Sequence, residues 1–281
     1  MTHARTARLV AEAAQRGGAV PSFNVITLEH AEAIVLGAED AGAAVLLQLS
    51  QNAVRYHGGL VPIAAACRAV ADAAAVPMAI HLDHIDDVAL AEEVIARGPA
   101  LGVSSIMIDA STLPYDENVA RTRELGARAR DAGLWVEAEL GEVGGKDGAH
   151  APGVRTDPSE AAAFVAATGV DGLAVAVGSS HAMTTRTADV DVDLVARLAA
   201  AVPVPLVLHG SSGVPDATIA AAVGAGIRKV NIGTALNVAY TRAVRAALAD
   251  DPAMTDPRTY LRPARAAMAA TVAELCRVVA G

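Results

Sequence analysis

The sequence contains few aromatic residues, and its charge balance is acidic. Phe, Trp and Tyr together make up 2% of the 281 residues, which leaves little material for the stacking platforms that bind single-stranded nucleic acids. The formal net charge is −9, and a protein of this sign is poorly suited to a polyphosphate backbone. We therefore expect no nucleic-acid partner.

Cysteines and long apolar runs are also scarce. Cys67 and Cys276 are the only two cysteines, far apart and each in an apolar helical pattern, which argues against a disulfide framework and a cysteine zinc site. No segment approaches the about 18 uncharged apolar residues that cross a membrane, and residues 1–18 are amphipathic rather than a signal sequence. These absences predict a cytoplasmic protein without a membrane partner.

Aliphatic side chains are abundant: hydrophobic residues make up 53% of the chain, and the mean hydropathy is +0.37. Short aliphatic runs alternate with amphipathic helical patterns, which is typical of parallel strands joined by crossover helices. Eight units in a row predict a single α/β domain over residues 1–281, a (β/α)8 TIM barrel with extra helical structure in residues 256–281. The expected strands are 19–25, 43–50, 76–83, 103–110, 134–140, 171–178, 204–210 and 227–233.

Polar residues collect at the C-terminal ends of these expected strands, where barrels of this kind build their active sites. They are Asn24, Gln48, Ser50, Asp83, His84, Asp109, Glu139, His181, His209 and Asn231. Imidazoles from three strand ends, His84, His181 and His209, predict a catalytic zinc site with one open position. Asp83 beside them suits acid–base chemistry.

Three other polar residues lie near the expected metal site. His81 shares the inward face with Asp83, and we expect it to support the site or the packing rather than to bind metal. Asp109 is equally suited to cap a helix and to orient a metal ligand. Glu139 shares one strand face with Glu137 and has apolar neighbours. Because a buried acid needs a cation, we expect Glu139 to lie near the metal.

Glycine-rich turns follow the last two expected strands. They span residues 210–213 and 231–234, and turns at this position commonly bind phosphate through backbone N–H groups and helix N-termini.

The chain resembles the class II, zinc-dependent ketose-bisphosphate aldolases. The resemblance lies in the motifs SFNV (22–25), QLS (48–50), HLDH (81–84), MIDAS (107–111), VEAELGEVGG (136–145), RTDP (155–158), VAVGSSH (175–181), LHGSSG (208–213) and KVNIGT (229–234). It implies His84, His181 and His209 as zinc ligands and Asp83 as the catalytic acid–base in reversible cleavage of a ketose phosphate to dihydroxyacetone phosphate and an aldehyde.

The resemblance also implies which residues bind dihydroxyacetone phosphate. They are Ala182, Gly210, Ser211, Ser212, Asn231, Ile232, Gly233 and Thr234. It further implies a homodimer or homotetramer, and some relatives hold a monovalent cation near the phosphate.

Several positions depart from the family pattern. The loop at residues 144–148 lacks the family's acid–base glutamate, for which Asp147 or Glu142 is a candidate replacement. A phosphate-binding lysine after His181 is missing, and Arg186 is a candidate to compensate. Gly233 and Ala235 replace two aspartates of the fructose-bisphosphate enzymes, so a tagatose bisphosphate or a deoxy-keto sugar phosphate is as plausible a substrate as fructose bisphosphate.

Two other functions compete with this interpretation. A metal-dependent sugar-phosphate epimerase or isomerase uses similar ligands but needs two opposed carboxylates, and only Asp83 is well positioned. A non-catalytic sugar-phosphate-binding barrel would explain the altered loop. A lysine Schiff base is disfavoured because Lys146 and Lys229 are the only lysines.

Overall fold

The computed structural model describes residues 3–140, 155–179 and 184–280 and contains a closed barrel of parallel strands. Neighbouring strands in the chain pair with each other, and β8 returns to β1. The strands are β1 (Val20–Asn24), β2 (Val45–Ser50), β3 (Met78–Ile85), β4 (Val103–Ile108), β5 (Trp135–Glu139), β6 (Gly172–Ala174), β7 (Leu206–Leu208) and β8 (Ile227–Ile232). The predicted (β/α)8 barrel is confirmed.

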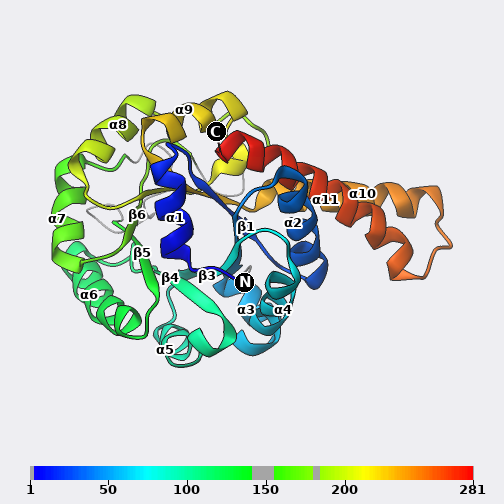
Figure 1. Cartoon of the computed structure of the whole chain (residues 1–281), viewed down its shortest axis with the longest axis horizontal. Helices are drawn as coiled ribbons and strands as arrows, with labels where there is room; N and C mark the ends of the chain where they lie inside the picture. The colour runs from blue at the N-terminus through cyan, green and yellow to red at the C-terminus, as the bar shows by residue number, and fades with distance from the viewer. Residues whose placement is uncertain (1–2, 141–154, 180–183, 281) are drawn as a thin grey trace.

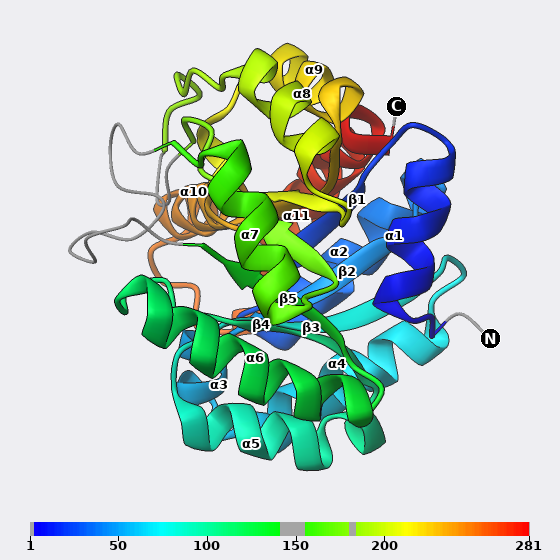
Figure 2. The same cartoon turned by 90° about the vertical axis from the view of Figure 1, so that its left-hand side faces the viewer.

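The helices after α1 follow the strands and cover the outside of the barrel, with α5, α6 and α7 side by side in Figure 2. They are α1 (Thr6–Gln15), α2 (Leu28–Ala41), α3 (Gln51–Tyr56), α4 (Leu60–Ala73), α5 (Val88–Arg97), α6 (Tyr115–Asp131), α7 (Pro158–Thr168), α8 (Val192–Ala201), α9 (Asp216–Ala225), α10 (Thr234–Asp250) and α11 (Pro257–Ala280). Local signals set several ends: Asp157 caps the first turn of α7, and Gly42 in a left-handed conformation ends α2.

The N-terminal helix α1 closes one end of the barrel. Its apolar residues Leu9 and Val10 form a buried cluster with Val20, Leu46 and Ala79, which lie in the N-terminal halves of their strands. Burial of these aliphatic side chains stabilises the helix against the barrel. The opposite end, where the strands terminate, stays open for the site.

The chain ends in two long helices, of which α10 follows β8 and α11 is extra to the barrel. Helix α11 is one continuous helix that packs on α2 and α10, and the connected ends of α10 and α11 project as an arm (Figure 1). The predicted extra C-terminal helix is therefore confirmed. None of the helices in the described ranges is long and apolar enough to cross a membrane.

Candidate active site

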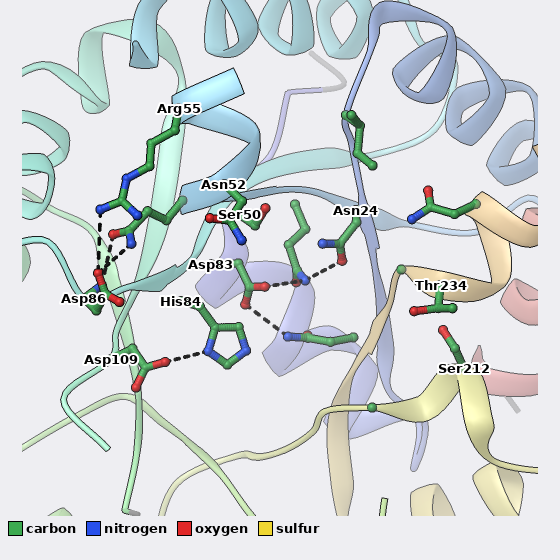
Figure 3. A pocket seen from close by; sticks show the side chains of 17 residues that line it. Asn24, Ser50, Asn52, Arg55, Asp83, His84, Asp86, Asp109, Ser212 and Thr234 are labelled. Atoms are coloured by element: carbon green, nitrogen blue, oxygen red, sulfur yellow. Dashed lines mark hydrogen bonds and ion pairs between the residues drawn. The ribbon is translucent and has the colours of Figure 1, made fainter. Parts of the chain in front are cut away.

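A pocket of about 530 Å³ opens at the C-terminal ends of the strands (Figure 3). Its lining combines strand ends with the loops that follow them. The lining residues are Asn24, Ile26, Gln48, Ser50, Gln51, Asn52, Arg55, Asp83, His84, Asp86, Asp109, Gly210, Ser212, Asn231, Gly233, Thr234 and Asn237. Most of the polar residues predicted to cluster at this edge are therefore brought together.

Asp83 lies in the floor of the pocket and is held by two amides. Its Oδ2 accepts a hydrogen bond from Gln48 Nε2 at 2.9 Å, and its Oδ1 accepts one from Asn231 Nδ2 at 3.2 Å. Burial would raise the pKa of Asp83, but the neighbouring His84, His81 and His209 outweigh it and hold the pKa below its ordinary value. The carboxylate is thus both ionised and fixed in orientation.

His84 reaches the pocket through an unusual backbone conformation. Its φ is 50°, the left-handed region, and it lies where the pairing of β3 with β4 shifts register between Leu82 and Ile85. Strained conformations of this kind persist where the surrounding structure enforces them, often at functional sites. The strand β3 continues to Ile85, two residues beyond its predicted end, and this bend turns the imidazole over the barrel mouth.

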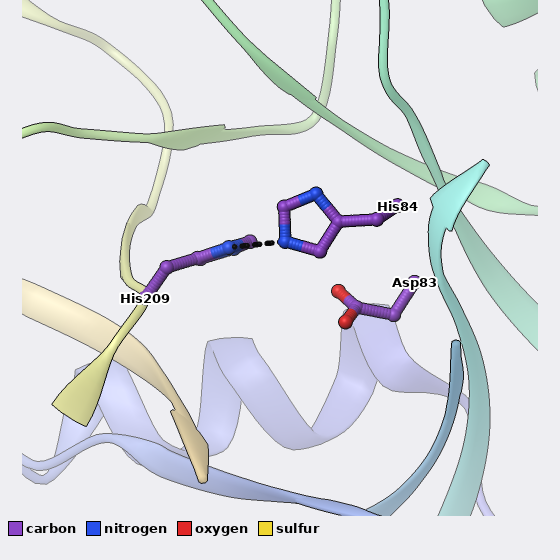
Figure 4. A group of neighbouring side chains, drawn as sticks. All are labelled: Asp83, His84 and His209. Atoms are coloured by element: carbon purple, nitrogen blue, oxygen red, sulfur yellow. Dashed lines mark hydrogen bonds between the residues drawn. The ribbon is translucent and has the colours of Figure 1, made fainter. Parts of the chain in front are cut away.

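Two imidazoles face each other across the mouth of the barrel (Figure 4). His84 Nε2 lies 3.0 Å from His209 Nδ1. On the outer sides of the pair, His84 Nδ1 contacts Asp109 Oδ2 at 2.7 Å, and His209 Nε2 contacts Glu137 Oε1 at 2.8 Å. Because the Asp109 carboxylate only accepts hydrogen bonds, His84 Nδ1 carries a proton, whereas His209 Nε2 lies beside both Glu137 Oε1 and, at 3.0 Å, the Asn231 amide nitrogen. The two inner nitrogens are directed at each other and are the ring atoms available to a metal ion.

This arrangement fits a divalent cation. Two imidazole nitrogens directed at each other need a proton or a metal ion beside them, and Asp83, His84 and His209 each offer a ligand atom within 4.8 Å of the others. Burial would lower the pKa of His84, but the carboxylate of Asp83 and the hydrogen bond that His84 donates to Asp109 raise it to about 10. The same surroundings that favour a proton here favour a metal ion, and imidazole is a preferred ligand of zinc. His181, the third predicted ligand, lies outside the described residues.

The carboxylates around the imidazole pair are themselves fixed. Asp109 accepts hydrogen bonds from the backbone N and Oγ of Ser111 at 3.1 and 2.7 Å. Burial would raise the pKa of Asp109, but the contact with His84 dominates and holds the pKa at about 2. Of the two roles considered for Asp109, the geometry fits the orientation of a metal ligand. Glu139 is 2% exposed, and its charge contributes to the raised pKa of His84.

A buried ion pair below the imidazoles was missing from the predicted site. Lys229 Nζ lies 2.8 Å from Glu137 Oε2 and 2.7 Å from Asn231 Oδ1, with Lys229 and Glu137 fully buried. The network thereby joins His209 to the amide that holds Asp83. The shared strand face of Glu137 and Glu139 was a usable signal, but sequence alone did not identify the cation that pairs with Glu137.

The two glycine-rich turns, at residues 210–213 and 231–234, form one wall of the pocket. Gly210 has a φ of 66°, which a glycine adopts without strain, and Ser212 Oγ accepts a hydrogen bond from Ala235 N at 3.1 Å. A Cβ on Gly233 would lie 3.1 Å from Cγ and Oδ1 of Asn24. The first turn of α10 begins here with Thr234, so backbone N–H groups and the positive end of a 17-residue helix meet at this wall.

Some predicted residues lie away from the open surface of the pocket. Ser211 and Ile232 are each 1% exposed and support the turns from behind, and the Ser211 hydroxyl binds the carbonyl of Asn231. Arg186 binds the Asp216 carboxylate and donates to Val214 O at 3.0 Å. It lines a separate pocket of about 190 Å³ together with Ser211 and Ser212, and its role in phosphate binding stays a prediction.

Other predicted residues cannot be located. Ala182, Glu142 and Asp147 lie outside the described residues, so the replacement for the family glutamate stays a prediction.

The pocket wall beyond Ser50 was also not predicted. Helix α3 begins directly after Ser50, whose Oγ accepts from Ala53 N at 3.2 Å, and it brings Gln51 and Arg55 to the pocket. Figure 3 shows Arg55 on the far side of Asp83 from Ser212 and Thr234. The guanidinium lies 3.4 Å from Asp87 and is half exposed.

The comparisons with known proteins agree with this geometry. The sequence matches the model of the family "Fructose-bisphosphate aldolase class-II" over residues 4–281. It is 39% identical to the "Probable fructose-bisphosphate aldolase" of Bacillus subtilis (strain 168) over 264 residues, which cover 92% of this chain and 91% of that protein.

Solved structures give the same result. The YdjI aldolase from Escherichia coli K12 is similar with a TM-score of 0.82 and 31% identity, covering 98% of this chain and 96% of that one. A putative fructose-1,6-bisphosphate aldolase from Coccidioides immitis is similar with a TM-score of 0.85 and 29% identity, at coverages of 98% and 96%. The chain therefore belongs to the class II fructose-bisphosphate aldolase family, and it is a carbon–carbon lyase of that family.

Proposed function

We propose that the protein is a zinc-dependent aldolase that reversibly cleaves a ketose bisphosphate to dihydroxyacetone phosphate and an aldehyde. The observation that carries the proposal is the pair of inward-facing imidazole nitrogens of His84 and His209, 3.0 Å apart and beside the fixed carboxylate of Asp83. His181 would complete the ligand set. A zinc ion bound there supplies Lewis-acid polarisation of the ketose carbonyl.

The protein's own residues account for substrate binding and proton transfer. The turns at Gly210–Gly213 and Asn231–Thr234 bind the phosphate of the dihydroxyacetone portion through backbone N–H groups. Asp83 takes the proton of the C4 hydroxyl during cleavage and returns it to the aldehyde oxygen during condensation. Gln48 and Asn231 keep its two oxygens aligned for this transfer, since each amide holds one of them.

Arg55 supports a substrate with a second anionic group. It lines the pocket on the far side of Asp83 from the phosphate-binding turns, so an extended sugar bisphosphate would run between the two ends. Its ion pair with Asp87 is exposed and therefore weak, which leaves the guanidinium available to a phosphate. With Gly233 and Ala235 in place of two aspartates, fructose and tagatose bisphosphates are both candidates.

We further propose a cytoplasmic homodimer or homotetramer. The projecting arm of α10 and α11 supports assembly, because Val238 and Leu248 of α10 are exposed apolar residues that a second copy would cover. Cys67 and Cys276 are both free thiols, which fits a reducing compartment. A monovalent cation beside the phosphate remains part of the proposal on the family resemblance alone.

A coupled assay for dihydroxyacetone phosphate tests the proposed function. Fructose and tagatose bisphosphates and a deoxy-keto sugar phosphate are supplied to the protein with and without added Zn²⁺. We expect cleavage of at least one ketose phosphate, loss of activity with EDTA and recovery with zinc. Cleavage that survives complete metal removal refutes the zinc mechanism. Epimerisation without dihydroxyacetone phosphate would establish the epimerase alternative instead.

A further inference from the structure

A buried histidine lies beneath the catalytic carboxylate, and the proposed mechanism does not use it. His81 is fully buried in β3, two residues before Asp83 on the same inward face. Its Nε2 has no hydrogen-bond partner among the described residues. That nitrogen lies 3.8 Å from Asp83 Oδ1 and 3.8 Å from Glu137 Oε2, so it is directed at two carboxylates.

The other ring nitrogen of His81 begins a chain of hydroxyl groups that runs to the N-terminal helix. His81 Nδ1 lies 2.9 Å from Ser105 Oγ, which lies 2.7 Å from Thr6 Oγ1. Thr6 Oγ1 in turn lies 2.8 Å from Ser104 Oγ, and the backbone N of Thr6 donates to the same oxygen at 3.1 Å. All four side chains of this chain are buried.

The direction of the hydroxyl chain decides which nitrogen of His81 carries the proton. In one direction, Ser104 donates to Thr6, Thr6 to Ser105, and Ser105 to Nδ1, so that the proton is on Nε2. In the other, Ser104 donates to the Ile80 carbonyl at 3.5 Å, which is the limit of a hydrogen bond, and the proton is on Nδ1.

The two carboxylates decide between these directions. A bare Nε2 lone pair would be directed at the negative oxygens of Asp83 and Glu137 in a buried setting, whereas an N–H there is attracted to both. In the first direction, only the long hydrogen bond from Ser104 Oγ to Ile80 O is absent. Burial and the charge of Lys229 lower the pKa of His81, which keeps the ring neutral.

We propose that His81 is a positioning residue: the Ser104–Thr6–Ser105 hydroxyl chain fixes its Nε2–H tautomer, and this N–H restrains the Asp83 carboxylate from below. Gln48 and Asn231 then hold Asp83 by hydrogen bonds, and the His81 N–H attracts it electrostatically from a third side at 3.8 Å. The kinetic consequence rests on the proposed aldolase function, whereas the tautomer does not.

Nitrogen NMR of zinc-loaded protein labelled with ¹⁵N-histidine tests the tautomer without any substrate. We expect His81 Nε2 to resonate as a protonated nitrogen and Nδ1 as a bare one, with the signals assigned by their loss in His81→Gln. Ser105→Ala removes the donor to Nδ1 and is expected to disturb these shifts. The control Thr168→Val removes a buried hydroxyl of α7 that binds Phe164 O and takes no part in this chain, and it should leave them unchanged. A protonated Nδ1 with a bare Nε2 overturns the proposal.

Two substitutions of His81 test the catalytic effect. Gln extends its amide nitrogen toward the position of Nε2, whereas Asn offers one only near Nδ1. We expect kcat to fall about 10- to 100-fold in His81→Asn and clearly less in His81→Gln, with KM and zinc content unchanged. Equal kcat values for the two folded variants overturn the positioning role. If the wild-type protein cleaves no ketose phosphate, the proposed function fails, and the nitrogen shifts alone decide the proposal.

Discussion

Replacing Asp109 by Asn should weaken zinc binding, because it changes which nitrogen of His84 carries the proton. In the wild-type protein, Asp109 Oδ1 accepts from Ser111 N and Oγ, and Oδ2 accepts from His84 Nδ1 at 2.7 Å. An Asn side chain must keep its oxygen toward the two Ser111 donors. Its NH₂ group then faces His84 Nδ1 and favours a proton on Nε2, the nitrogen expected to bind zinc.

The size of the effect follows from the contact that is lost. A hydrogen bond to a charged group contributes about 1.5–3 kcal/mol, and loss of a partner that orients a metal ligand costs about 10- to 100-fold in metal affinity. Both values predict that the Kd for zinc rises by about one to two orders of magnitude in Asp109→Asn, since tenfold corresponds to about 1.4 kcal/mol. Competition with a chromogenic chelator measures this Kd, and activity at saturating zinc should recover in part.

A carboxylate from the same pocket provides the control. Asp86 also lines the pocket, but the described contacts of its side chain are with Gln51 and Arg55 rather than with an imidazole. Asp86→Asn should therefore leave the zinc Kd within about twofold, as expected for a group that does not orient a ligand. A wild-type zinc affinity in Asp109→Asn, or an equal loss in both variants, would refute the reasoning.

Three further outcomes are expected. Asp83→Asn should lower kcat by about 10²- to 10⁴-fold, because a general acid–base is lost, while zinc content measured by mass spectrometry stays at the wild-type level; a kcat near wild type excludes the proton-transfer role. EDTA should abolish cleavage, and stoichiometric Zn²⁺ should restore it in the same sample; restoration by Mg²⁺ but not by Zn²⁺ would contradict the proposed metal. Glu137→Gln should destabilise the fold by about 3 kcal/mol, because Lys229 loses its buried counter-charge, and urea denaturation with an unchanged midpoint would argue against this pair as a structural element.

The sequence predicted the barrel well because its signals are local. Each expected strand is an aliphatic run, and seven of the eight observed strands lie inside their predicted ranges, with β3 extending to Ile85. The polar side chains at strand ends converge because parallel strands of a closed barrel end at one edge. Asp83, His84 and His209 were all predicted on this basis, and the structure brings them together.

The residues that support the site were harder to predict. Lys229 and Glu137 come from β8 and β5, and their contact depends on the closure of the barrel, which no short pattern encodes. Arg186 was considered for phosphate binding by its position after His181, and the structure adds that its side chain pairs with Asp216, 30 residues further along the chain. Such pairings depend on side-chain direction in three dimensions rather than on spacing along the chain.

The sequence by itself determined which side chains are available and at which end of the barrel they lie. Side chains alternate between the two faces of a strand, and the order of strands and helices can be predicted from local patterns. Only the tertiary structure decided which atoms face one another. Asp109 and Glu137 hold the outer nitrogens of His84 and His209, so that the two inner nitrogens meet. Proton positions depend on partners that lie 25 and 72 residues away in the chain, and only the closed barrel brings those partners within hydrogen-bond distance.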